Sequence, residues 1–75
     1  MYTILKKVVH SEYFTSVQTL DVRAIETYDE AVKRLADYVV NLTRDMTVYG
    51  LEQREGYFGF SSSEGHRVVI KVIEI

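Results

Sequence analysis

The sequence predicts an α+β fold: a single amphipathic helix packed on a mainly antiparallel four- to five-stranded sheet. The chain has 75 residues, which is enough for one domain with one core. One segment alone has apolar residues at helical spacing, while the segments around it are rich in β-branched and aromatic residues. The expected order is strand, strand, helix, strand, strand, strand. The sequence contains no proline, so every strand residue can donate a backbone hydrogen bond.

Two strands are expected before the helix. Residues 2–9 are rich in β-branched and aromatic side chains and predict the first strand. Residues 13–26 predict a long, bent second strand. Its apolar alternation changes face near Gln18 and Thr19, which indicates a β-bulge there.

The helix is expected over residues 28–44. Thr27 and Glu30 fit a capping box, in which each side chain accepts a hydrogen bond from a backbone N–H at the helix start. Apolar residues then recur in steps of four and three and form one stripe. The stripe consists of Tyr28, Val32, Leu35, Val39, Leu42 and Met46.

Three further strands are expected over residues 47–53, 57–62 and 66–74. The two breaks between them, residues 54–56 and 63–65, each place a glycine last in three residues. A type I turn followed by a residue with positive φ closes a three-residue hairpin, and glycine adopts that conformation without steric cost. The repeated turn chemistry indicates an antiparallel meander.

The predicted core joins the helix stripe to apolar strand positions. It comprises Leu20, Val22, Val32, Leu35, Val39, Leu42, Phe60, Ile70 and Val72. One helix covers only two or three strands of such a sheet, yet the first and last strands are apolar on both faces. Either these strands are central in a curved sheet that closes on itself, or a partner covers the second face. The second alternative predicts a homodimer through Leu5, Val9, Val69, Ile73 and Ile75.

Composition excludes several functional classes. The chain has no cysteine, nine Lys and Arg, 11 Asp and Glu, and a net charge of -2. It therefore has no disulfide or thiolate chemistry, and it is too acidic to bind nucleic acid non-specifically. The longest apolar runs are three residues, so no membrane segment is expected. We expect a soluble cytoplasmic protein.

No catalytic residue, metal ligand or cofactor is predicted. His10 and His66 lie at expected strand ends without metal-ligand spacing, and no serine lies in a nucleophile elbow. The segment 56–60 (GYFGF) departs from the RNA-binding strand motif by one residue, so Phe58 and Phe60 are assigned to the core and nucleic-acid binding is not expected. Enzyme activity is not expected.

Tyrosine provides the positive signal for function. The chain has six tyrosines, and tyrosine is enriched at protein interfaces. The candidates for binding a protein partner are Tyr13, Tyr38, Tyr49 and Tyr57. The alternative is a homo-oligomer that binds a phosphorylated metabolite or nucleotide through Ser62, His66 and Arg67. We favour the protein binder, since a chain this small is expected to have little room for a ligand pocket of about 300 Å³ or more.

The order of elements, with segments such as TYDEAVKRL and YFGFSSSEG, resembles small accessory proteins of phages and mobile elements, including anti-CRISPR inhibitors. The resemblance extends over the whole chain and assigns no functional residue. Proteins of this type mostly act by covering a protein surface. The resemblance therefore implies a non-enzymatic binder, such as an inhibitor of a host defence complex, which would act in the host cytoplasm if a phage encodes it.

Overall fold

The computed structural model describes residues 1–21 and 23–75. They form one α-helix and five strands in the order predicted from the sequence. The elements are β1 (Tyr2–Ser11), β2 (Phe14–Thr19), α1 (Tyr28–Thr43), β3 (Val48–Arg54), β4 (Tyr57–Ser62) and β5 (Arg67–Glu74). The α+β class is therefore confirmed.

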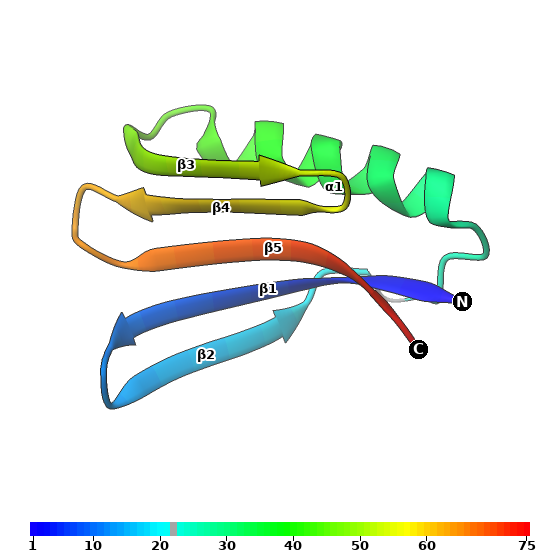
Figure 1. Cartoon of the computed structure of the whole chain (residues 1–75), viewed down its shortest axis with the longest axis horizontal. Helices are drawn as coiled ribbons and strands as arrows, with labels where there is room; N and C mark the ends of the chain where they lie inside the picture. The colour runs from blue at the N-terminus through cyan, green and yellow to red at the C-terminus, as the bar shows by residue number, and fades with distance from the viewer. Residues whose placement is uncertain (22) are drawn as a thin grey trace.

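All five strands belong to one antiparallel sheet with the order β2-β1-β5-β4-β3 (Figure 1). Three of the neighbouring pairs are hairpins, and the fourth joins the first strand of the chain to the last. The first and last strands of the chain, β1 and β5, therefore lie in the interior of the sheet, as the first of the two alternatives predicted. The sheet does not close on itself, because β2 and β3 remain edges.

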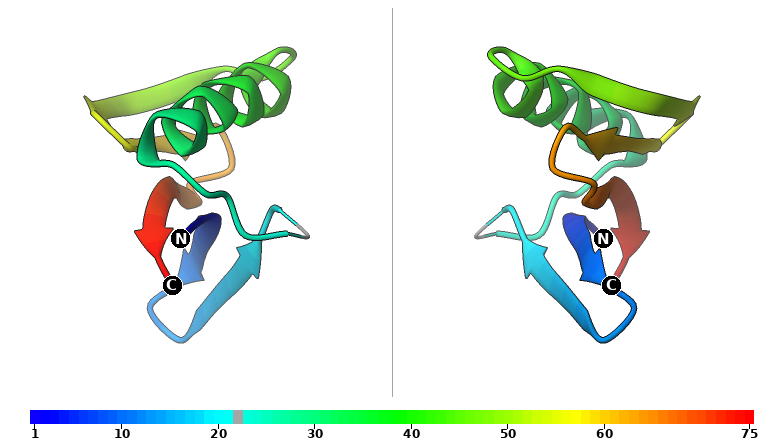
Figure 2. Two further views of the ribbon diagram at one scale, coloured as in Figure 1. Left: turned by 90° about the vertical axis from the view of Figure 1, so that its right-hand side faces the viewer. Right: turned by 90° about the vertical axis from the view of Figure 1, so that its left-hand side faces the viewer.

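Helix α1 packs on one side of the curved sheet, toward its β3 end (Figures 1 and 2). The Thr27 hydroxyl accepts a hydrogen bond from the backbone N–H of Glu30 at 3.2 Å, which satisfies one of the free donors of the first turn. The Glu30 carboxylate bonds Arg34 instead of returning to the cap. No helix in the described part of the chain is long and apolar enough to cross a membrane.

The core lies between α1 and strands β1, β4 and β5, which supply its buried strand residues. Leu35, Phe60 and Ile70 are buried as predicted, and Leu20, Val39, Leu42 and Val72 pack against them at partial exposure. Phe58, assigned to the core from its place in the segment 56–60, is buried as well. Four further buried residues were not predicted: Ile4, Ile25, Ala31 and Val68. The predicted core residue Val22 lies outside the described residues. Tyr28 and Met46, at the two ends of the helix stripe, are exposed.

The second strand is shorter than predicted. β2 ends at Thr19, and the predicted bulge at Gln18 and Thr19 is absent, since β2 pairs with β1 in regular register there. The irregularity lies instead near the hairpin, between Val9 and Ser11. After β2 the chain must cross to the start of α1, and an isolated bridge between Tyr2 and Ile25 fixes that crossing.

Both predicted turns contain a glycine with positive φ. Gly56 has φ +71° and Gly65 has φ +87°. The β4–β5 hairpin closes over residues 63–65 as predicted, with a hydrogen bond of 2.8 Å from the Ser62 N–H to the His66 carbonyl. The loop of the β3–β4 hairpin is one residue shorter than predicted, because Arg54 already pairs with Tyr57.

Candidate protein-binding surface

One face of the sheet carries no second layer among the residues that the structure describes (Figure 2). We call it the open face, and its residues follow from the strand register. Three rows of directly opposed residues cross all five strands: Arg54, Tyr57, Lys71, Leu5 and Thr19; Glu52, Gly59, Val69, Lys7 and Val17; Tyr49, Ser61, Arg67, Val9 and Thr15. Thr3 and Ile73 form a further pair at one end.

The open face is basic although the chain is acidic. It carries Lys7, Arg54, Arg67 and Lys71 against the single carboxylate of Glu52. Of the nine Lys and Arg and 11 Asp and Glu in the chain, the remainder has five basic and ten acidic residues. A chain with net charge -2 therefore presents a face with net charge +3, and such a separation attracts an anionic surface.

Arg67 anchors the β3 side of this face. Its Nη1 donates to the Gly50 carbonyl at 2.7 Å and to the Ser61 hydroxyl at 3.3 Å, while Nη2 lies 3.3 Å from Glu52 Oε2. The guanidinium crosses β4 at Gly59, where a Cβ atom would lie 3.0 Å from Nη2. Glycine at this position therefore leaves the space through which Arg67 reaches β3.

A row of basic and aromatic groups lies beside this anchor. The Arg54 guanidinium carbon lies 4.1 Å from the centre of the Tyr57 ring, and Tyr57 is opposite Lys71 on β5. Glu52 already serves two arginines, with Oε1 at 3.4 Å from Arg54 Nη2. No ion pair among the described residues involves Lys7 or Lys71, so these two ammonium groups are available to a partner.

The aliphatic part of the open face contains the residues predicted for self-association. Leu5, Val9, Val69 and Ile73 all lie on it and are half-buried among their neighbours. Ile75 is more exposed and lies beyond β5, where its N–H donates to the Met1 carbonyl at 2.9 Å. The sheet thus brings together four of these five residues.

The four tyrosines predicted to bind a partner are not brought together. Tyr49 and Tyr57 share the open face on adjacent strands. Tyr13 lies in the turn between β1 and β2 and is 90% exposed. Tyr38 is half-buried on α1, and its hydroxyl donates to the Leu20 carbonyl at 2.9 Å.

The alternative ligand residues are separated by the sheet. Ser62 and His66 line a hollow on the helix side with Phe60 and Val68, whereas the Arg67 side chain lies on the open face. The His66 ring packs against the His10 ring, with 4.7 Å between the ring centroids. This contact was not predicted, because the two residues lie far apart in the sequence. His10 Nε2 in turn lies 3.0 Å from the Ser16 hydroxyl. The three predicted ligand residues therefore do not converge on one phosphate-sized site.

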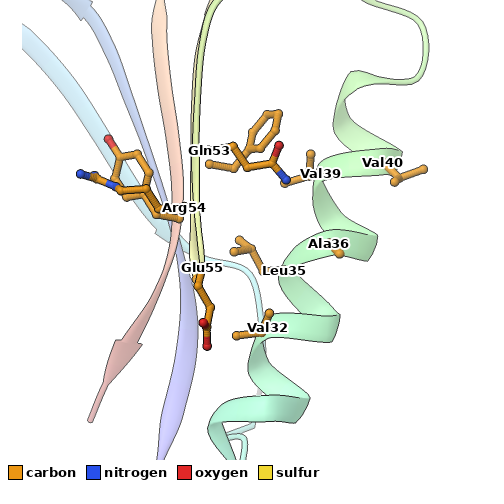
Figure 3. A pocket seen from close by; sticks show the side chains of 11 residues that line it. Val32, Leu35, Ala36, Val39, Val40, Gln53, Arg54 and Glu55 are labelled. Carbon is orange, nitrogen blue, oxygen red and sulfur yellow. The ribbon is translucent and has the colours of Figure 1, made fainter.

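A groove separates α1 from the β3–β4 hairpin. It has a volume of 470 Å³, larger than expected for so small a chain. Its helix side is aliphatic, and Val32, Leu35 and Val39 point into it while Arg54 lies on the far side of the sheet (Figure 3). The groove arises because the helix does not close completely over the hairpin.

The described residues contain no group of three or more His, Asp or Glu side chains that could hold a metal ion. Comparisons of the chain with protein-family models, with curated proteins and with solved structures find no match. The charge and packing of the open face are therefore the basis for assigning a function.

Proposed function

We propose that this chain is a non-enzymatic protein-binding module that docks its open face on an acidic, partly apolar surface of another protein. The observation that carries the proposal is the separation of charge, with Lys7, Arg54, Arg67 and Lys71 gathered on the face that the helix leaves uncovered. Complementary charge steers association and selects partners. A module that covers a partner's surface in this way would act as an inhibitor or adaptor.

An interface of standard size would take only part of the surface of this chain. A standard interface buries about 800 Å² on each partner, and the accessible surface of the chain is 5184 Å². Half-buried aliphatic residues at Leu5, Val9, Val69 and Ile73 supply apolar contact area, and Lys7 and Lys71 lie directly opposite Val69 and Leu5 in the same rows. The face therefore offers apolar and basic groups side by side.

Two features favour a protein over single-stranded nucleic acid. Sheet-surface readers of RNA leave aromatic rings free to stack on bases, whereas Arg54 already lies over the Tyr57 ring. Outside the open face, acidic residues outnumber basic ones ten to five, which would repel an extended polyanion.

Charge also favours a different protein over a second copy docked face to face. Such a dimer would press the basic groups of one open face against those of the other, with Glu52 the only carboxylate of that face. Like charges brought together at an interface are unfavourable. The predicted self-association through Leu5, Val9, Val69, Ile73 and Ile75 is therefore less favourable than binding an acidic partner.

Selection from a displayed peptide library tests this proposal. The purified chain is the bait, and the composition of the enriched peptides is the readout. We expect peptides that combine Asp or Glu with apolar residues, and their affinity should fall as salt rises. Lys71→Glu should abolish their binding, while Lys33→Glu, the same charge change on the exposed side of α1, should preserve it.

Two results would overturn the proposal. One is enrichment of basic or uncharged peptides by the wild-type chain. The other is equal loss of binding in both charge variants, which would reflect net charge rather than the open face. Oligodeoxythymidylate is titrated in parallel, and tighter binding of it than of the enriched peptides would assign the face to nucleic acid.

A further inference from the structure

We propose that the outer edge of β2 pairs with β2 of a second copy, so that two sheets join into one continuous antiparallel sheet. This inference does not rest on the proposed function, because the pairing is made by backbone groups at the edge of the sheet, although the side chains of Thr15, Val17 and Thr19 lie on the open face. All six residues of β2 are exposed, including Phe14 and Val17 at 59% each. An exposed edge strand is a template for pairing with another chain.

The two edges of the sheet differ in their protection. β3 has a register shift between Tyr49 and Glu52 and carries charges at Glu52 and Arg54, and bulges and charges are the usual means of blocking edge pairing. β2 carries no charged residue or proline, and its register with β1 is regular from Thr15 to Thr19. β2 is therefore the edge that can accept another strand.

The backbone of β2 shows which groups are available. Leu20 N–H donates to the Ile4 carbonyl at 2.9 Å. Hydrogen-bonded pairs alternate along an antiparallel ladder, so Gln18 and Ser16 also bond to β1. Thr15, Val17 and Thr19 consequently direct their N–H and C=O groups outward. All three are β-branched residues, which favour strands.

This edge is complementary to itself. In an antiparallel pair centred on Val17, Val17 lies opposite the same residue of the second copy, and Thr15 lies opposite Thr19. Each such pair exchanges two backbone hydrogen bonds, and paired β-branched residues pack well across strands. The two-fold axis is perpendicular to the sheet, so both open faces lie on the same side and stay free.

The available area indicates a weak dimer. Two short edge strands bury less than the roughly 1,200 Å² of a standard interface, which places the contact among transient ones. A second copy is nevertheless the expected partner of this edge, because the self-paired register places uncharged residues with high strand propensity opposite one another.

Sedimentation equilibrium of the full chain tests the pairing. The weight-average mass should rise from 8.7 kDa toward twice that value between about 10 µM and about 1 mM, the range expected for a transient contact. Val17→Pro removes an outward N–H that the β1 ladder does not use, and it should weaken the dimer about tenfold or more. Val17→Thr keeps the N–H and the branched side chain, and it should leave the dissociation constant within about threefold.

A second pair of variants tests the pairing even if Val17→Pro does not fold. Val17→Lys places like charges opposite each other in the dimer and should weaken it about fivefold. Gln18→Lys adds the same charge on the other face of β2 and should have a smaller effect. A wild-type mass that remains at 8.7 kDa at the highest concentration, or a dimer unaffected by both Val17→Pro and Val17→Lys, would overturn the proposal.

Discussion

The guanidinium of Arg67 on β5 donates a 2.7 Å hydrogen bond to the carbonyl of Gly50 on β3, two strands away. Gly50 has φ +57° and lies within the register shift of β3. The bond therefore ties an irregular edge strand to the centre of the sheet. It also fixes a positive charge on the open face.

Replacement of Arg67 should loosen the adjoining part of β3. We expect Arg67→Ala to lower the free energy of unfolding by about 1 kcal/mol, since hydrogen bonds from a charged group are lost at a partly exposed site. Amides of residues 48–51 should exchange with solvent faster. Arg54→Ala is the matched control, because Arg54 contacts Tyr57 near the other end of the strand. Unchanged exchange at 48–51 in Arg67→Ala would contradict this account.

The hydroxyl of Tyr38 joins α1 to the chain segment that follows β2. It donates to the Leu20 carbonyl at 2.9 Å, so Tyr38→Phe should lower the free energy of unfolding by about 1 kcal/mol at pH 7. Burial, with the nearby Asp21 carboxylate, raises the pKa of Tyr38 above its ordinary value. The folded state thus favours the protonated phenol.

This raised pKa predicts the direction of the pH dependence. The stabilisation is complete below the unfolded-state pKa of tyrosine, about 10, and is lost as the pH rises through the higher folded-state value. In urea unfolding from pH 7 to 11, the stability difference between wild type and Tyr38→Phe should narrow above about pH 10. A constant difference over this range would rule out the assigned linkage.

The helix cap gives a separate test of the α1 start. Thr27→Ala removes the acceptor of the Glu30 N–H and should cost about 1 kcal/mol of stability, whereas Thr27→Ser keeps the hydroxyl and should cost little. Thermal unfolding followed by circular dichroism measures both variants. Equal stability of Ala and Ser at this position would show that the cap contributes nothing.

Two alanine substitutions on α1 distinguish its inward face from its outer face by their effect on stability. Leu35 is 5% exposed and Val40 is 58% exposed. Leu35→Ala should therefore cost about 2–5 kcal/mol, while Val40→Ala should change the free energy of unfolding by less than about 0.5 kcal/mol. Denaturant melts that coincide for wild type and Leu35→Ala would contradict the helix orientation.

Local chemistry determined how much of the fold could be predicted. The Thr27 cap, the periodic apolar stripe and the glycines of the two turns all act within a few residues, and the predicted element order is confirmed. The end of β2 depends instead on a distant contact, the bridge between Tyr2 and Ile25. A prediction from strand propensity alone therefore extends the second strand beyond Thr19, where β2 ends.

The sequence indicated the aliphatic residues of the open face and two of its tyrosines, Tyr49 and Tyr57, but not its basic rows. Alternation within β1 and β5 indicated the apolar positions, but the basic rows need the strand order, which pairs Tyr57 with Lys71 and places Arg67 across β4 from Gly50. These relationships join residues far apart in sequence. Lys7 and Lys71 share the open face because β1 pairs with β5. The sequence alone therefore did not indicate these two lysines as binding residues.

The assignment of the open face as the binding surface is tested most directly by mapping backbone amide chemical shifts while the most enriched acidic peptide is titrated into the labelled chain. The largest changes should fall on β1, β4 and β5, around Lys7, Tyr57 and Lys71, and they should disappear in Lys71→Glu but persist in Lys33→Glu. Changes concentrated on α1 or in the groove beside it, with the open-face amides unmoved, would contradict the account.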